Sequence, residues 1–97
     1  MNLRKDQALL EMLSRANLQA RGWETVDYWD ADLCAIGIRS QQCPGRLVYV
    51  STFNKSPGLF DYECEGPGRE GNPYTTVKSG KDASLDELLK AIGEHLA

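Results

Sequence analysis

Histidine and cysteine, the residues that most often bind metals or act as nucleophiles, are scarce in this chain. Its 97 residues include one histidine, His95, and three cysteines. They form no CxxC or HExxH pattern and no Cys/His cluster with ligand spacing. A lone histidine at the end of a terminal helix is usually solvated near the negative helix end. We therefore expect no metal, no cofactor, no catalytic residue and no enzymatic activity.

Long apolar runs are also missing. The N-terminal residues lead into charged side chains without a stretch of signal-peptide length, and no stretch approaches the length of a membrane span. The three cysteines are odd in number and widely spaced, which favours free thiols over a disulfide framework. We therefore expect a cytoplasmic protein in which Cys34 and Cys64 are buried and Cys43, in a turn, is exposed.

The chain has little excess charge. Its net charge is −3, with 41% hydrophobic and 26% charged residues, which is ordinary for one globular domain spanning 1–97 and gives no electrostatic case for binding nucleic acid. The charge is unevenly distributed, because residues 22–65 hold seven acidic and three basic side chains. An acidic middle predicts a basic partner; the alternative is a surface that only keeps the protein soluble.

Two segments have helical periodicity, one near each end of the chain. Apolar residues recur at helical spacing over 3–20, and Gly22 follows as a stop. Residues 84–96 begin with a capping box, in which the Ser84 hydroxyl accepts an amide of the first turn while the Glu87 side chain reaches back. An apolar stripe follows along this second helix: Leu85, Leu88, Leu89, Ile92 and Leu96.

Between the helices the period of the apolar residues changes to two. This alternation predicts five strands, at 23–29, 32–39, 46–53, 59–65 and 74–78. Short connections between them predict an antiparallel meander, and the glycine- and proline-rich segment 66–73 is expected to be a loop. The predicted fold class is α+β: an N-terminal helix, an antiparallel meander of four to five strands, and a C-terminal helix, with both helices on one face of the sheet.

Alternation also divides the predicted sheet into two faces. The face expected against the helices is nearly all apolar. It comprises Val26, Tyr28, Cys34, Ile36, Ile38, Val48, Val50, Phe60, Tyr62 and Cys64. The opposite face, expected in water, mixes four large aromatics with four carboxylates of one charge sign. These are the candidate partner-binding residues: Trp23, Asp27, Trp29, Tyr49, Phe53, Asp61, Glu63 and Glu65.

The carboxylates of that face allow more than one interpretation. Asp61, Glu63 and Glu65 lie about 7 Å apart along one strand face. Acid–base catalysis needs a cleft that raises one pKa, and an open sheet face offers none. A solubilising strand, with Trp23 and Trp29 covering the edge of the core, is the alternative without function. Aromatic groups surrounded by acidic ones instead favour a docking surface for a basic protein.

Four stretches carry a resemblance at the level of arrangement. The first helix ends in RGW (21–23), the meander contains GRLVYV (45–50) and FDYECE (60–65), and the chain closes with SLDELLKAI (84–92). This arrangement resembles the small α+β immunity proteins of bacterial polymorphic toxin, contact-dependent and type VI secretion systems. The resemblance implies a cytoplasmic protein that binds and blocks one cognate toxin domain, often a basic one. It implies no catalytic residues and identifies no contact positions.

Two other functions stay open at this point. A secretion chaperone for an effector is also small, acidic and α/β, and a long exposed apolar helix or strand edge for dimerisation would favour it. A small ligand-binding domain or enzyme would be favoured by a deep pocket that holds a perturbed carboxylate. The contact with a partner could be made by the open sheet face, by the 66–73 loop or by a helix.

Overall fold

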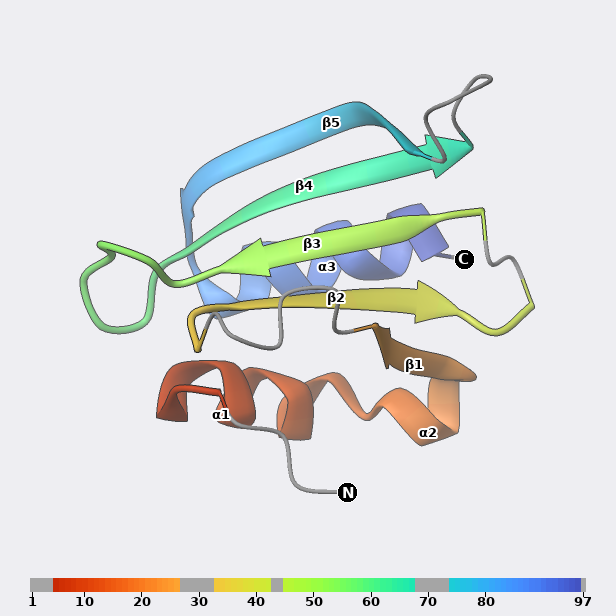
Figure 1. Ribbon diagram of the computed structural model, residues 1–97. Coiled ribbons are helices and arrows are strands. Elements are labelled where there is room, and N and C mark those ends of the chain that lie inside the picture. Colours follow the sequence, from red (N-terminus) through yellow and green to blue (C-terminus); the bar gives the residue numbers. More distant parts are fainter. Residues whose placement is uncertain (1–4, 27–32, 43–44, 68–73, 97) are drawn as a thin grey trace.

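A five-stranded sheet with helices along one side makes up the fold (Figure 1). The computed structural model describes residues 5–26, 33–42, 45–67 and 74–96. Neighbouring strands are all antiparallel, and their order in the sheet is their order in the chain. The predicted α+β class and meander are therefore confirmed. The elements are α1 (Gln7–Ala16), α2 (Leu18–Arg21), β1 (Trp23–Val26), β2 (Ala35–Ser40), β3 (Leu47–Ser51), β4 (Phe60–Pro67), β5 (Tyr74–Ala83) and α3 (Leu85–Leu96).

The single helix predicted over 3–20 is two helices with a later start. Asp6 is the N-cap of α1: its carboxylate accepts the Leu9 amide at 2.9 Å. The same carboxylate accepts the hydroxyl of Thr52, just beyond β3, and so anchors the start of α1 to the sheet. Asn17 separates α1 from α2 with a φ of 53°, a left-handed conformation that asparagine tolerates better than most residues.

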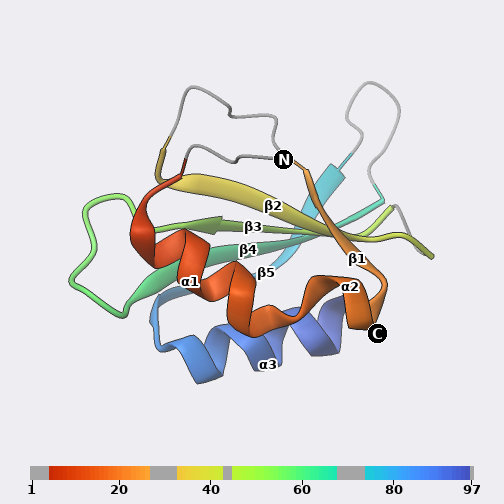
Figure 2. The same cartoon turned by 90° about the horizontal axis from the view of Figure 1, so that it is seen from below.

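The core lies between the helices and one face of the sheet. Figure 2 shows α1 and α3 on the same side of the sheet, and their buried side chains join strand residues in one cluster. Each fully buried aliphatic side chain contributes about 1.5–3 kcal/mol through removal of apolar surface from water. The main members are Leu9, Met12, Ile36, Ile38, Val48, Val50, Phe60, Cys64, Leu88, Ile92 and Leu96. For β2, β3 and β4 the predicted inner face is therefore confirmed.

For β1 the predicted faces are reversed. Trp23 is 7% exposed and belongs to the core cluster, with the Arg21 guanidinium 4.9 Å from the centre of its ring. Thr25 pairs with Ile38 and so shares the helix side, whereas Val26 pairs with Gly37 and faces away. The apolar surface of a tryptophan far exceeds that of a valine, so its burial decides which side of this short strand turns inward.

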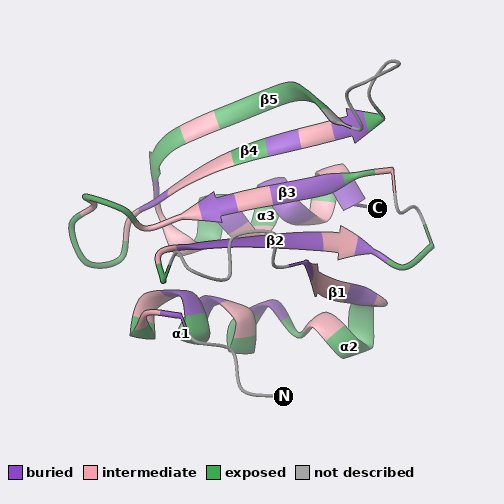
Figure 3. Ribbon diagram, viewed as in Figure 1, coloured by how far each residue is buried: buried purple, intermediate pink, exposed green. Residues whose placement is uncertain are grey.

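Strand β5 is longer than predicted and lies at an edge of the sheet. The sequence after Lys78 has the composition of a turn, which ends the predicted strand there. In the structure the pairing with β4 continues to Ala83, because β5 accommodates extra residues in two bulges. One bulge includes Asp82, whose φ is 52°. Figure 3 shows β5 as mostly exposed, unlike β2, which is buried along most of its length.

The start of α3 agrees with the predicted capping box. The Glu87 amide donates to the Ser84 hydroxyl and the Ser84 amide donates to the Glu87 carboxylate, both at 3.2 Å. Leu88, Ile92 and Leu96 of the predicted stripe are buried, whereas Leu85 and Leu89 are half-buried at the margin of the core.

Gly80 should not tolerate a side chain. A Cβ atom there would lie 2.4 Å from Cε1 of Tyr62, its partner on β4. The Tyr62 ring packs against the core cluster and cannot move away without loss of contact. We expect Gly80→Ala to lower the free energy of unfolding by about 1–3 kcal/mol, measured by denaturant melts.

Gly66→Ala is the matched control for Gly80→Ala. Among the described residues, a Cβ at Gly66 would meet only Cγ1 of Val77, at an ordinary 3.6 Å. We expect a change within about 0.5 kcal/mol. Equal effects of the two substitutions would contradict the close packing of Tyr62 on Gly80.

Two aromatics of the predicted partner-binding set should differ sharply in their effect on stability. Trp23 is in the core, whereas Phe53 is 69% exposed. We expect Trp23→Ala to cost about 3–5 kcal/mol and Phe53→Ala to change the free energy of unfolding by less than about 0.5 kcal/mol. Denaturant melts measure both, and a small loss for Trp23→Ala would show that its ring is not in the core.

Candidate functional site: the exposed part of the open sheet face

The face of the sheet turned away from α1 and α3 is here called the open face. Strand register places its residues in three rows across the sheet. The rows are Gly37–Tyr49–Glu63–Ser79, Arg39–Leu47–Glu65–Thr76 and Ala35–Ser51–Asp61. Four of the eight predicted partner-binding residues, Tyr49, Asp61, Glu63 and Glu65, are therefore on one face, as the sequence predicts.

The open face is not uniformly accessible. Val26, Ala35 and Leu47 are buried although none belongs to the core cluster on the helix side. Tyr49 is half-buried and Glu63 is exposed, and the exposure continues across β5 (Figure 3). The sequence predicts a wet face across the whole sheet, but among the described residues the fully exposed positions of this face lie on β4 and β5, with half-buried Tyr49 and Ser51 of β3 beside them.

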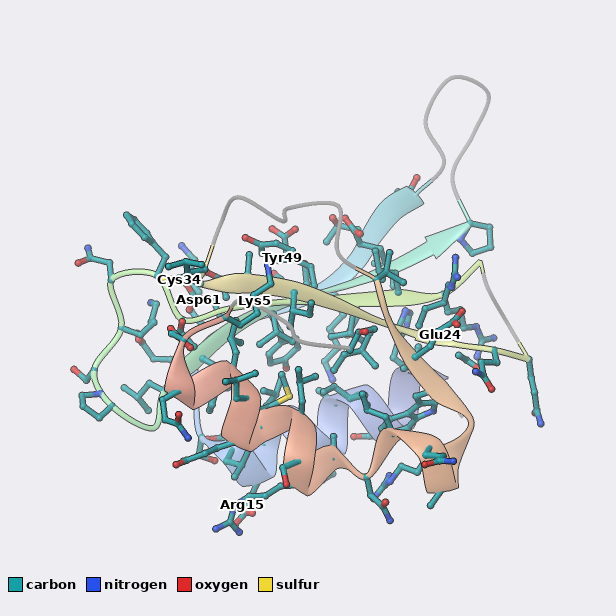
Figure 4. All side chains as sticks on the ribbon, turned by 60° about the horizontal axis from the view of Figure 1, so that its bottom comes forward. Lys5, Arg15, Glu24, Cys34, Tyr49 and Asp61 are labelled. Atoms are coloured by element: carbon teal, nitrogen blue, oxygen red, sulfur yellow. The ribbon has the colours of Figure 1, made fainter. Side chains whose placement is uncertain are left out.

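A shallow hollow of about 210 Å³ lies in this exposed part. Side chains of the open face form its walls. Tyr62 and Gly80, which strand alternation places on the helix side of the sheet, also line it. Figure 4 places Tyr49 and Asp61 in the sheet layer, away from Arg15 on the outer side of α1. The hollow is lined by Tyr49, Ser51, Asp61, Tyr62, Glu63, Ser79, Gly80 and Lys81.

Asp61 is already compensated by a cation. Nζ of Lys55, in the turn after β3, lies 3.0 Å from Oδ1 of Asp61 and 3.1 Å from Oδ1 of Asp82. Burial alone would raise the pKa of Asp61, but the Lys55 hydrogen bond and the Asp82 amide, which donates at 3.1 Å, lower it below its usual value. The prediction that this face has a single charge sign is therefore wrong.

A second ion pair on the open face joins β1 and β2. Nη2 of Arg39 lies 2.6 Å from Oε1 of Glu24. Among the residues that the structure describes, Glu63 and Glu65 are then the carboxylates of this face without an ion-pair partner. Burial raises the pKa of Glu65, and the charge of Glu63, two residues away, raises it further.

The other predicted site residues do not join this group. Trp23 lies in the core, on the opposite side of the sheet. Phe53 lies past the end of β3, where its amide donates to the Ser51 hydroxyl at 3.1 Å, and it does not line the hollow. Asp27 and Trp29 lie outside the described residues, as does the 68–73 part of the predicted loop.

Sequence reasoning missed Ser79, Lys81 and Lys55, three of the polar residues at the site. Ser79 and Lys81 follow the point where the strand pattern ends in turn-like residues, so only the bulged pairing of β5 brings them beside β4. Strand alternation continued past Lys78 could have identified Ser79. Lys55 belongs to a predicted turn, and no sequence signal connects it to Asp61.

His95 is not a solvated terminal residue as expected. It is half-buried, and its Nε2 lies 2.7 Å from the backbone carbonyl of Glu65. A carbonyl oxygen only accepts, so Nε2 carries the proton and donates. Nη1 of Arg46 donates to the His95 carbonyl at 3.3 Å. The hydrogen bond from His95 thereby joins the end of α3 to the backbone of β4 at Glu65.

The two described cysteines differ in exposure. Cys64 is buried, and burial raises the pKa of its thiol. Cys34 is half-buried, which corrects the expectation that it is fully inside, because it precedes the first paired residue of β2. Cys43 lies outside the described residues.

In the described part of the chain, no group of three or more His, Cys, Asp or Glu side chains could hold a metal ion. None of the helices described is long and apolar enough to cross a membrane.

The Asp61–Lys55 pair should make stability depend on pH in acid. Because the folded pKa of Asp61 lies below the unfolded value of about 3.8, its stabilising effect is present above that pH and is lost as the pH falls through the folded pKa. We expect Asp61→Asn to lower the melting temperature at pH 7 and to have little effect once the parent carboxylate is protonated.

Glu63→Gln is the control for this titration, because Glu63 has no ion pair among the described residues. It should leave the melting temperature unchanged at pH 7, or raise it slightly by removing repulsion with Glu65. A pH-independent effect of Asp61→Asn in thermal melts would show that its loss is not electrostatic.

Comparison with known proteins finds no relative of this chain. No family model, no curated protein and no solved structure matches the chain.

Proposed function

We propose that this chain is a non-enzymatic protein-binding domain that docks a basic partner on the exposed part of its open face. The specific class that we propose is a bacterial immunity protein, which binds and blocks a cognate toxin domain. The observation that carries the proposal is that Glu63 and Glu65 have no compensating cation in the described part of the chain. They are neighbouring acids without an ion pair among the described residues, on a face where Glu24 and Asp61 are each paired.

The electrostatics of these two acids favour a cationic ligand. Glu65 is partly desolvated and is repelled by Glu63, and both effects raise its pKa. A cation placed beside the pair relieves the repulsion and replaces lost hydration. The free protein thus contains an unfavourable interaction that a basic partner would remove.

An aromatic side chain lies next to this charge. Tyr49 is the direct cross-strand neighbour of Glu63, and Phe53, past the end of β3, is a largely exposed aromatic farther from the pair. Tyrosine and phenylalanine are enriched where proteins meet, because they supply large contact areas with few rotatable bonds. An exposed acidic and aromatic surface supports protein binding better than catalysis, since Glu63 is open to water and no cleft isolates it.

The toxin-blocking class rests on the arrangement of the chain together with this charge. The structure has the helix, five-stranded meander and helix on which the resemblance to immunity proteins is based. Toxin domains that attack nucleic acids are often basic, which suits an acidic docking surface.

A secretion chaperone is less well supported. A chaperone of this kind would dimerise through an apolar edge. The edge strand β5 is mostly polar: threonines, lysines and a serine surround Val77, which is its exposed large apolar residue among those whose exposure is described.

Affinity capture tests the proposal. The immobilised protein is exposed to lysate of its native host, and Glu63→Lys with Glu65→Lys is compared with a control of equal net charge, Glu11→Lys with Glu94→Lys, which alters exposed helix positions. We expect a basic protein to be retained by the parent and the control. The site variant should weaken its binding at least about tenfold, mainly through slower association, and most strongly at low salt.

A growth assay then tests the toxin class. Expression of the captured protein should inhibit growth of the host, and co-expression of this chain, but not of the site variant, should restore it. Retention of the same partner by all three proteins would exclude the open face as the binding surface. A captured protein without effect on growth would leave a binding domain of another class.

A further inference from the structure

We infer that the hollow beside Tyr49 and Glu63 receives one arginine side chain of the partner, whose guanidinium lies on the Tyr49 ring and pairs with the Glu63 carboxylate. This inference rests on the proposed function, because it assigns the anchor residue of the same docking surface. It follows from the size of the hollow, its charge and the order of the side chains that form its walls.

The size of the hollow limits what it can hold. Its volume of about 210 Å³ is below the range of about 300–1,000 Å³ typical of pockets for small molecules and cofactors. It also opens on a sheet face and not into the interior. One long side chain, extended from the surface of a partner, fits these dimensions better than a free ligand that needs to be enclosed.

The charges around the hollow select a cation. Asp61 is bridged by Lys55, and the charge of Lys81 also acts on Asp61. Glu63 is then the acid of the hollow without an ion pair among the described residues, and Glu65 adds a second negative charge two residues along β4. An anionic side chain would be repelled here, and a neutral one would leave the repulsion between the two glutamates in place.

The order of side chains across the strands favours arginine over lysine. Tyr49 on β3, Glu63 on β4 and Ser79 on β5 are direct neighbours in one row. A planar guanidinium can stack on an aromatic ring while its fork of N–H groups reaches a carboxylate and an adjacent hydroxyl. An ammonium is a compact, strongly hydrated charge that gains less from the ring.

The binding of single side chains tests this inference on the protein alone. The 15N-labelled protein is titrated with N-acetyl-arginine methylamide and, separately, with N-acetyl-lysine methylamide, while amide shifts are followed by NMR. We expect saturable shifts at Tyr49, Glu63 and Ser79, with the arginine compound binding at least about threefold more tightly than the lysine compound.

Matched variants separate the contributions of the acid and the ring. Glu63→Gln should abolish saturable binding of the arginine compound, whereas Glu94→Gln, at an exposed position of α3, should leave it unchanged. Tyr49→Phe keeps an aromatic ring and should retain the preference for arginine. Tyr49→Leu should bind both compounds equally weakly; its amide spectrum also reports whether the fold is intact.

The failure of this inference is distinguishable from failure of the proposed function. No saturable shift, equal affinity for the two compounds, or binding unaffected by Glu63→Gln would overturn the arginine anchor. The capture experiment stands apart from these results, because a basic partner lost on reversal of Glu63 and Glu65 would still support the docking surface. Loss of the preference in Tyr49→Leu but not in Tyr49→Phe would support stacking on the ring.

Discussion

The packing of α1 and α3 against one face of the sheet is the interaction on which the rest of the structure depends. Leu9 and Met12 from one helix and Leu88 and Ile92 from the other meet the inward side chains of β2, β3 and β4. Successive residues of a strand point to opposite faces, so this burial also fixes which side chains point outward. The row that contains Tyr49 and Glu63 is on the open face because Val48, Val50 and Cys64 are in the core.

The edges of the sheet obey the same constraint less strictly. In β1, a short strand, the bulk of Trp23 determines which side turns inward, and the alternation of the smaller residues is overruled. In β5 two bulges shift the pairing with β4, and Gly80 leaves room for the Tyr62 ring. These adjustments bring Ser79 and Lys81 to the hollow, so the candidate site depends on irregularities of an edge strand as much as on the regular sheet.

Ion pairs on the open face restrict its uncompensated negative charge to a small area. Formal charges counted along the chain treat Asp61, Glu63 and Glu65 alike, but Lys55 reaches Asp61 from a neighbouring turn. The carboxylates that stay without a compensating cation among the described residues are Glu63 and Glu65, beside the Tyr49 ring. The backbone carbonyl of Glu65 accepts a hydrogen bond from His95. The structure thus replaces the broad acidic face that the sequence predicts with a small negative site next to Tyr49.

The sequence by itself determined the α+β class, the meander, the capping box at Ser84 and the inward faces of the three central strands. Each of these depends on periodicity or on contacts within a few residues, which a linear pattern records. The sequence also placed Tyr49, Asp61, Glu63 and Glu65 on one face, because strand parity is local. Only the tertiary structure decided that Trp23 is a core residue, that the helix breaks at Asn17 and that Lys55 neutralises Asp61. It also decided that β5 continues past its apparent turn. These outcomes depend on competition for buried space and on contacts between distant segments, neither of which a local pattern contains.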